Sequence, residues 1–393
     1  GEEGADPVGF SRDNKSVYQI DSPNGGPSAL YRLDLATGQQ GIVLQDDVSD
    51  VVKMVIGPDM REIVGVQFQP DRPSVKYLDE KSPYVRLHKG LRKAFGGDEI
   101  EITSFTKDGR EAVVRAYSDR NVGDYYIVDL STKKAEYVAS AAQWIDPAQM
   151  AERKPIVVQA RDGLDLHGYL TLPPQVKAEQ LPMVVLPHGG PHGVRDDWGY
   201  NAEAQLLANR GYAVLQLNYR GSGGYGLTFE SAGFRQWGRK MQDDLTDATR
   251  WAIAQKLADP SRICIYGASY GGYAALMGAM REPDLYRCAV SYAGVTDLAL
   301  MYTDGSTDSS QSENYLERVV GADTAELAAN SPVNLVQRLK APLLVVHGGM
   351  DKIVPQSHAE ALRKRLDEQG KAYEWLVKAN EGHGFYADAN RKE

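Results

Sequence analysis

The chain has 393 residues, more than a single hydrophobic core usually takes, so we expect two domains. Its hydrophobic fraction of 42% is typical of a globular protein, and its net charge of −9 argues against binding to nucleic acid. No apolar stretch is long enough to cross a membrane and no signal peptide is visible, so we expect a soluble protein of the cytoplasm or the periplasm, with no membrane partner. Because the chain begins with Gly1 rather than methionine, we expect that an upstream segment has been removed.

Residues 1–145 have the pattern of short strands separated by turns. Three similar segments start about 47 residues apart, and they cover 9–20, 56–68 and 104–116. A repeat of this length is typical of β-propeller blades, and each blade is a four-stranded sheet. The sequence therefore predicts about three blades of a partial β-propeller. A closed ring normally needs about four blades or more, so we expect the missing blades upstream of Gly1, in the same gene product or on a separate cleaved chain.

From residue 150 to 393, strands alternate with helices, after a proline-containing linker at 145–155. Near-continuous apolar strands that alternate with helices predict a mostly parallel sheet covered on both faces. The predicted strands are 182–187, 212–219, 262–267, 288–294, 342–348 and 373–379, and the predicted helices are 201–211, 240–257, 272–280 and 356–370. Cys264 and Cys288, the only cysteines, lie in apolar runs, so we expect two buried small hydrophobic residues. Two cysteines are too few for a disulfide framework or a Cys-rich zinc site.

The segment Gly267-Ala268-Ser269-Tyr270-Gly271 is a G-x-S-x-G motif between a predicted strand and a predicted helix. The chain turns so sharply in this motif that side chains at the glycine positions would collide, and the turn holds the serine out at the start of the helix. The alternative is a glycine-rich turn in which the serine has no role. The strand–turn–helix context favours Ser269 as a catalytic nucleophile.

A serine nucleophile needs a histidine base, and the histidine needs an acid, in the chain order Ser, Asp or Glu, His. His383 is the preferred base, because it lies between two glycines in a loop after the last predicted strand. His347, at a strand end, and His358, in a charged and presumed solvated helix, are the alternatives. Asp351 is the preferred acid, and Asp297, which also follows a strand, is the second candidate.

An oxyanion hole requires two hydrogen-bond donors beside the nucleophile. The backbone N–H of Tyr270 is the first, and the loop 186–193, "LPHGGPHG", is expected to supply the second from Gly190, with Gly189 as the alternative. His188 and His192 in this loop lack neighbouring ligands at metal-binding spacing, so they are interpreted as loop-shaping residues and no metal is expected. The segment 221–226 matches G-x-G-x-x-G, but it lacks the context of a dinucleotide site and is expected to be a flexible loop near the active site.

The segments "HGGPHG", "NYRGSGGYG", "GASYGGYAAL", "HGGMDKIVP" and "EGHGF" occur in the order seen in the prolyl oligopeptidase family of serine peptidases. The chain resembles most closely the branch of acylaminoacyl peptidases and bacterial dipeptidyl-peptidase-like enzymes. The resemblance implies an α/β fold, with an α/β-hydrolase peptidase domain at 150–393 preceded by the partial β-propeller at 1–145. It implies that Ser269 is the nucleophile, that Asp351 orients His383, and that His383 acts first as base and then as acid.

The resulting functional prediction is a cofactor-independent serine peptidase that cleaves short peptides through an acyl-enzyme. The substrate pocket is expected near the nucleophile, with Leu298, Met301, Tyr302 and Val354 as candidate lining residues, and an apolar pocket would favour hydrophobic residues or proline. A carboxylesterase with the same triad is the main alternative, and a binding protein with a vestigial triad is a third. Exopeptidase or endopeptidase action stays open, as does the oligomeric state, a homo-oligomer included.

Overall fold

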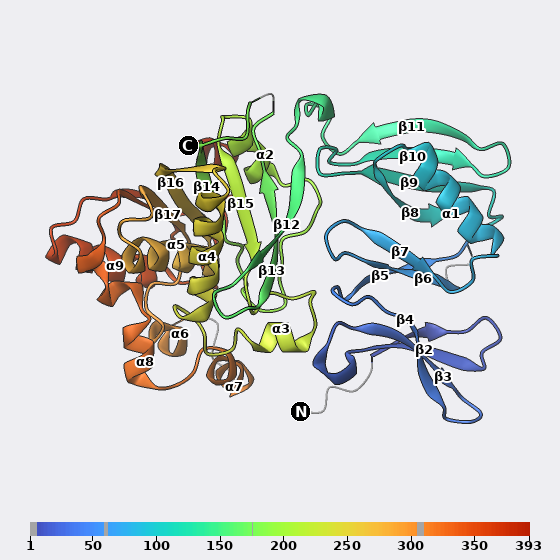
Figure 1. Cartoon of the computed structure of the whole chain (residues 1–393), viewed down its shortest axis with the longest axis horizontal. Helices are drawn as coiled ribbons and strands as arrows, with labels where there is room; N and C mark the ends of the chain where they lie inside the picture. The colour runs from blue at the N-terminus through green and yellow to red at the C-terminus, as the bar shows by residue number, and fades with distance from the viewer. Residues whose placement is uncertain (1–5, 59–61, 175, 305–309) are drawn as a thin grey trace. The chain divides into compact units, whose positions relative to one another are not determined.

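The computed structural model describes residues 6–58, 62–174, 176–304 and 310–393. By their internal contacts these residues form two compact units. The first comprises 1–155, 197–209 and 224–228, and the second comprises 156–196, 210–223 and 229–393. The helices and strands of both units are labelled in Figure 1.

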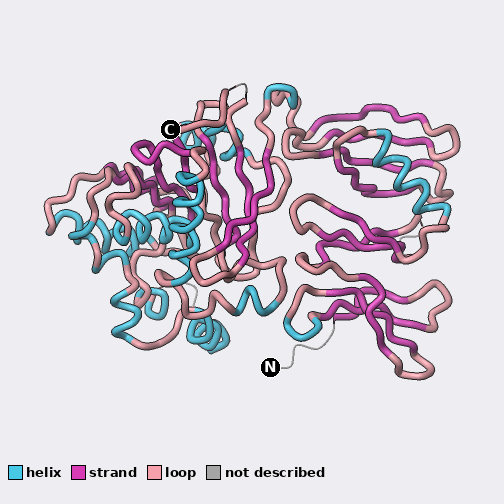
Figure 2. Tube along the Cα trace, in the orientation of Figure 1, coloured by secondary structure: helices cyan, strands magenta, loops and turns pink. Residues whose placement is uncertain are grey.

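The first unit contains three antiparallel sheets, each built from strands that follow one another in the chain (Figures 1 and 2). The first sheet consists of β1 (Asp6–Phe10), β2 (Ser16–Asp21), β3 (Ala29–Asp34) and β4 (Gln40–Leu44). The second consists of β5 (Val51–Ile56), β6 (Ile63–Phe68) and β7 (Ser74–Tyr77). The third consists of β8 (Glu99–Phe105), β9 (Glu111–Tyr117), β10 (Asp124–Asp129) and β11 (Lys134–Ser140). These sheets are three blades of a partial β-propeller.

The middle blade departs from the four-stranded pattern. Its third strand is followed by a helix, α1 (Pro83–Ala94), rather than by a fourth strand. The Ser82 hydroxyl accepts a hydrogen bond from the backbone N–H of Tyr84, which caps the helix, and Pro83 stands at the first helical position. Tyr84 and Val85 then pack against Val55 and Val64 of the middle blade. The prediction of four strands in every blade was therefore wrong here, because helical periodicity outweighed the repeat.

Hydrophobic clusters connect neighbouring blades. Leu30 of β3 packs with Ile63, Val66 and Phe68 of β6, all of them buried. Leu91 of α1 belongs to the cluster that fills the third blade. The blades thus share apolar cores along the chain, as stacked repeats do when no single one can bury its own faces.

The second unit is built on an eight-stranded sheet with the order β12-β13-β15-β14-β16-β17-β18-β19. The strands are β12 (Arg153–Gln159), β13 (Asp165–Thr171), β14 (Leu181–Val185), β15 (Ala213–Asn218), β16 (Ala258–Ala268), β17 (Cys288–Tyr292), β18 (Leu343–Gly348) and β19 (Glu374–Lys378). From β15 to β19 every neighbouring pair is parallel, whereas β13 runs antiparallel to β15. All six residues of β15 are buried, and because successive side chains point to opposite faces, the sheet is covered on both sides. This is an α/β-hydrolase fold.

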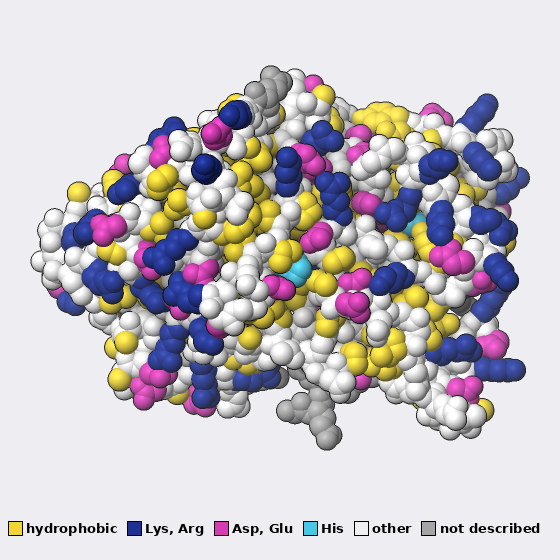
Figure 3. All heavy atoms as spheres, viewed as in Figure 1, with side chains coloured by type: hydrophobic (Ala, Val, Ile, Leu, Met, Phe, Trp, Pro, Cys, Tyr) yellow, Lys and Arg dark blue, Asp and Glu magenta, His cyan; other side chains and the backbone are white. Residues whose placement is uncertain are grey.

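The helices of the second unit lie between or after these strands. They are α4 (Lys240–Ala254), α5 (Tyr270–Arg281), α6 (Leu300–Thr303), α7 (Ser310–Val319), α8 (Thr324–Ala329), α9 (Gln356–Glu368) and α10 (Asp388–Lys392). The helix α2 (Ala202–Ala208) belongs to the first unit, and α3 (Leu227–Ser231) begins in the first unit and ends in the second. Among the described residues, no helix is both long enough and apolar enough to cross a membrane. On the face drawn in Figure 3, basic and acidic side chains are interspersed.

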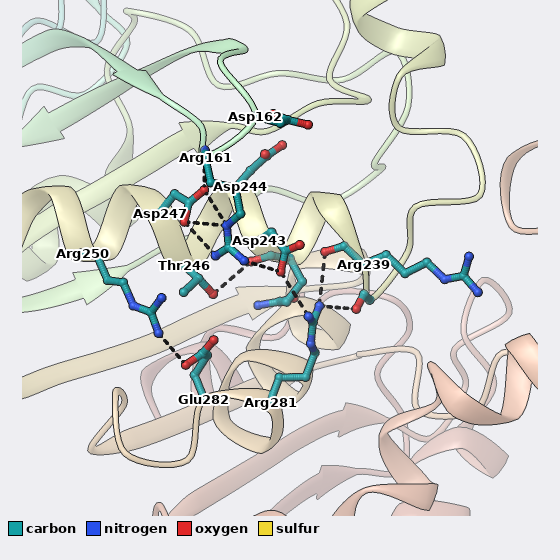
Figure 4. A network of polar contacts seen from close by, with 12 residues as sticks. Arg161, Asp162, Arg239, Asp243, Asp244, Thr246, Asp247, Arg250, Arg281 and Glu282 are labelled. Atoms are coloured by element: carbon teal, nitrogen blue, oxygen red, sulfur yellow. Dashed lines mark hydrogen bonds and ion pairs between the residues drawn. The ribbon is translucent and has the colours of Figure 1, made fainter.

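Ion pairs link α4 to the turn between β12 and β13, where Arg161 of the turn pairs with Asp247 on α4 (Figure 4). The guanidinium of Arg220 forms ion pairs with Asp244 on α4 and with Asp162 in the turn, with closest N–O distances of 2.7 and 2.8 Å. The Arg220 and Asp244 side chains are buried, whereas that of Asp162 is 35% exposed. Burial alone would lower the pKa of Arg220, but the two carboxylates outweigh burial and raise this pKa above its usual value. The arginine is therefore a permanent buried charge.

The cysteines differ from the sequence-based expectation. Cys264 and Cys288 are partners in the register of the parallel strands β16 and β17, with their Cα atoms 4.7 Å apart, and a disulfide joins them. They are therefore a cross-strand link rather than two separate apolar side chains.

Candidate active site

Ser269 occupies the sharp turn between β16 and α5. Its backbone has φ 58° and ψ −123°, a conformation that is strained for a residue with a side chain. A Cβ added at Gly267 would lie 2.5 Å from the carbonyl oxygen of Gly271, and one added at Gly271 would collide with the carbonyl oxygen of Pro187. The two glycines are therefore required by close backbone approach, and they allow the turn that presents Ser269 at the start of α5.

Asp351 and His383 are brought together by the loops after the last two strands. Nδ1 of His383 lies 2.7 Å from Oδ2 of Asp351, which follows β18, and His383 itself follows β19. The Asp351 side chain is fully buried, while the His383 side chain is 28% exposed. A buried acid thus holds the Nδ1 edge of an imidazole that stays partly exposed, as a base that meets a substrate requires.

Asp351 is kept ionised by its neighbours. Burial opposes ionisation, but the hydrogen bond with His383 and those from the backbone N–H groups of Val354 and Ile353 outweigh it, so the pKa of Asp351 is below its usual value. His347, the alternative base, is buried, and its Nε2 lies 2.8 Å from the carbonyl oxygen of Val354. It therefore supports the loop that carries Asp351 instead of facing a substrate.

Tyr292, at the end of β17, ties the serine turn to the histidine loop. Its carbonyl oxygen accepts a hydrogen bond from the N–H of Ser269 at 2.9 Å. Its hydroxyl accepts one from the N–H of Phe385, two residues after His383, at 2.5 Å, and its ring packs edge-on against that of Phe385. One residue therefore fixes the positions of both segments.

The loop after β14 lies against the serine. A Cβ added at Gly189 would be 3.5 Å from the Cβ of Ser269, and Gly190 has φ +107°, a conformation that favours glycine. The ring of His188 stacks on that of Tyr219 at 4.4 Å, and its two nitrogens lie within hydrogen-bond distance of the carbonyl oxygen of Gly189 and the hydroxyl of Ser222. Burial lowers the pKa of His188 to about 4, so the ring is neutral and shapes the loop.

A pocket of about 450 Å³ opens beside Ser269. Among the described residues, its wall includes Gly190, Ser269 and Tyr270, together with Met301 and Val354 of the four predicted pocket residues. Leu298 and Tyr302 do not line this pocket. Leu298 is buried and its N–H donates to the Ser331 hydroxyl, while the Tyr302 hydroxyl donates to the carbonyl oxygen of Gly321.

Comparison with known proteins matches the C-terminal half of the chain to one protein family. Residues 198–393, which include Ser269, Asp351 and His383, match the model of the prolyl oligopeptidase family. The chain belongs to this family.

Two individual relatives match nearly the whole length of this chain. The chain is 33% identical to dipeptidyl aminopeptidase BIII of Pseudoxanthomonas mexicana, over 98% of this chain and 57% of that protein. It is 26% identical to dipeptidyl peptidase family member 6 of Caenorhabditis elegans, over 98% of this chain and 56% of that protein. The chain thus spans little more than half the length of these members of the family.

Two solved structures have the same fold. The puromycin-hydrolyzing peptidase of Mycobacterium tuberculosis superposes with a TM-score of 0.76 at 23% identity, covering 96% of this chain and 58% of that one. An acylaminoacyl peptidase of Pyrococcus horikoshii superposes with a TM-score of 0.69 at 20% identity, covering 96% of this chain and 59% of that one. At these identities the likeness shows the fold alone.

Two sequence-based expectations near the site were wrong. His358 is buried rather than solvated, and it lies on the pocket wall, where its Nδ1 accepts a hydrogen bond from the N–H of Thr296. The segment 221–226 is a loop, as predicted, but it is largely buried instead of exposed and flexible, and the Ser222 hydroxyl donates to the Tyr219 carbonyl oxygen. The second candidate acid, Asp297, accepts a hydrogen bond from the N–H of Ala299, so its carboxylate serves the local turn.

Several residues of this site were missed in the sequence analysis. Trp237 and Asp304 line the pocket, although neither belongs to a recognised motif. Tyr292 could have been found, because it directly precedes the turn Ala293–Gly294 at a strand end. Within the described part of the chain, no group of three or more His, Cys, Asp or Glu side chains could hold a metal ion.

Proposed function

We propose that the protein containing this chain is a serine peptidase that hydrolyses short peptides through an acyl-enzyme. The observation that carries the proposal is the 2.7 Å contact between the buried Asp351 carboxylate and His383, in a unit that also presents Ser269 on the wall of a pocket. The names of the curated relatives, a dipeptidyl aminopeptidase and a dipeptidyl peptidase family member, support a peptide substrate.

In the proposed reaction, Ser269 attacks the carbonyl carbon of the scissile bond while Nε2 of His383 takes the hydroxyl proton. Asp351 accepts the Nδ1–H of His383 and so keeps the basic lone pair on Nε2. The protonated His383 then gives its proton to the leaving amine, and an acyl ester remains on Ser269. Water, activated by His383, hydrolyses that ester and regenerates the serine.

The negative charge that develops on the carbonyl oxygen needs donors in fixed positions. The N–H of Tyr270, the first residue of α5, follows the nucleophile directly, and a helix N-terminus favours negative charge. We assign the second donor to the N–H of Gly190, which shares the pocket wall with Ser269 and Tyr270. Both donors are backbone groups, so their positions are set by the fold and not by side-chain rotation.

Cleavage of a panel of chromogenic peptides by the full-length protein tests the proposal, with the N-terminus free or acylated and a nitrophenyl ester beside them. We expect peptide cleavage that disappears in Ser269→Ala and survives in Ser357→Ala. Ser357 is the matched control because its buried hydroxyl has no hydrogen-bond partner among the described residues. Cleavage of free but not acylated peptides would establish an exopeptidase that needs the amino terminus. Ester turnover without cleavage of any peptide would replace the proposal with a carboxylesterase.

A further inference from the structure

The pocket beside Ser269 has walls of two different kinds. One group of lining residues is apolar and mostly buried, whereas the other is polar and consists of Asp304, directly after α6, and of residues at the start of α7. The apolar group includes Val295, Leu316 and Val354, and the polar group includes Asp304, Gln311 and Ser312. The four residues that the sequence suggested for this pocket did not include these polar side chains. A pocket with both apolar and polar walls fits a side chain that has an aliphatic stem and a polar head.

Asp304 is the only acidic residue among those described on the wall of this pocket. It follows α6 directly, and its N–H donates to the carbonyl oxygen of Leu300 at 2.9 Å, so its backbone is held by the helix end. None of the ion pairs found among the described residues includes Asp304. Arg318, on the following helix, has its guanidinium over the ring of Phe234, 5.0 Å from the ring centre. Asp304 therefore brings a negative charge to the pocket that no described cation neutralises.

The histidine on the described wall, His358, adds no positive charge. Burial lowers the pKa of His358 to about 4, although Asp297, Asp304 and Asp351 act in the opposite direction. With Nδ1 accepting the N–H of Thr296, the neutral ring carries its proton on Nε2. Among its described residues, the pocket wall thus has one acidic side chain and one neutral imidazole.

We propose that Asp304 selects substrates with a lysine or arginine side chain on the residue whose carbonyl Ser269 attacks. This inference rests on the proposed function, since it assigns the acyl-side substrate residue to the pocket that Ser269 shares. The apolar wall contacts the methylene stem, and the carboxylate of Asp304 pairs with the ammonium or guanidinium head. A partly buried charge pair of this kind contributes more than an exposed one, because solvent screens it less.

The test uses two dipeptide nitroanilides that differ in one group, alanyl-lysine and alanyl-norleucine. Norleucine keeps the aliphatic stem and lacks the ammonium, so the ratio of the two kcat/KM values isolates the charge. We expect the full-length protein to prefer the lysine substrate by at least about tenfold. Asp304→Asn is expected to abolish this preference by lowering kcat/KM for lysine only. Glu313→Gln, an exposed acid of α7 outside the pocket wall, is the matched control and should keep the preference.

Three outcomes would overturn the inference while leaving the peptidase intact. In the first, norleucine is cleaved as well as lysine in a Ser269-dependent reaction. In the second, Asp304→Asn lowers both substrates equally, which would indicate damage to the pocket rather than loss of a charge pair. In the third, the lysine preference persists in Asp304→Asn, which would assign recognition of the ammonium to another group of the protein.

The inference can be separated from the proposed function by labelling Ser269 without turnover. Diphenyl phosphonates with a lysine-like or a norleucine-like side chain react with an activated serine. Faster labelling by the lysine-like reagent, lost in Asp304→Asn, supports the inference even if nitroanilides are poor substrates. Equal labelling by both reagents rejects it while supporting the reactive serine, and absence of labelling by either rejects both proposals.

Discussion

Oδ2 of Asp351 lies 2.7 Å from Nδ1 of His383, although the two residues are 32 positions apart in the chain. The contact exists because β18 and β19 are neighbouring parallel strands whose carboxyl ends meet at one edge of the sheet. A buried acid and a partly exposed base are therefore positioned by the two strands and not by any local sequence pattern.

Replacing Asp351 tests this relationship. Asp351→Asn keeps the size of the side chain but favours the wrong imidazole tautomer, so we expect kcat to fall by about 10³–10⁴-fold, as in serine proteases generally. Asp297→Asn is the matched control, because Asp297 was the second candidate acid and its carboxylate binds the N–H of Ala299. We expect that variant to keep its activity within a few-fold. Equal losses in both variants would argue against Asp351 as the orienting acid.

Two glycine-to-alanine changes, one in the serine turn and one in α1, are expected to have opposite effects on the stability of the fold. A Cβ at Gly271 collides with the carbonyl oxygen of Pro187, so Gly271→Ala is expected to destabilise the fold by about 2–4 kcal/mol and to reduce activity. Gly90, inside α1, has nothing within 4 Å of an added Cβ, and Gly90→Ala should stabilise by about 0.5–1 kcal/mol. Urea unfolding of both variants measures the difference. A Gly271→Ala variant as stable as the wild type would show that the turn is looser than described.

The Arg220 ion pairs predict that Asp244 and Asp162 contribute unequally to the stability of the fold. Asp244→Asn leaves a buried guanidinium without its closest buried partner, which is expected to cost about 3–5 kcal/mol. Asp162 is 35% exposed, so Asp162→Asn should cost less than about 1 kcal/mol. The unfolding free energies of the two variants compare these values directly. A similar loss of unfolding free energy in both variants would mean that the burial of Asp244 does not determine how much its ion pair stabilises the fold.

Buried neutral histidines predict how stability depends on pH. Burial lowers the pKa of His358 and of His88 to about 4, from an ordinary value of 6.5. Between about pH 6.5 and pH 4 the unfolded chain therefore binds protons that the folded chain does not, and stability falls as the pH is lowered through this window. Unfolding midpoints in urea at pH 7 and pH 5 measure the loss. His88→Gln should reduce the pH dependence, and an unchanged dependence in that variant would contradict the assignment.

Much of the second unit follows from local sequence, because its strands are continuous apolar runs and its glycines mark obligatory turns. The same reasoning failed for His358, although Ala359, Leu362 and Leu366 share its helix face and are all buried. The charged residues of α9 lie on the opposite face, and they concealed the apolar stripe. Attention to helical periodicity would have placed His358 inside the fold.

Other features could not be predicted from one sequence. The disulfide depends on the register that makes Cys264 and Cys288 partners in parallel strands, and no local pattern sets that register. The pocket depends on how the segment after β17 folds back, which brings Met301 and Asp304 to the wall while Leu298 turns into the core. The missing propeller blades expected from the sequence stay a prediction.

The central claim is that Ser269 is an activated nucleophile, and covalent labelling tests it most directly. The full-length protein would be treated with a fluorophosphonate, digested, and examined by mass spectrometry to locate the adduct. We predict a single adduct on Ser269 that is absent from Ser269→Ala and forms much more slowly in Asp351→Asn. A folded protein that takes up no label, or takes it up at another residue, would contradict the account.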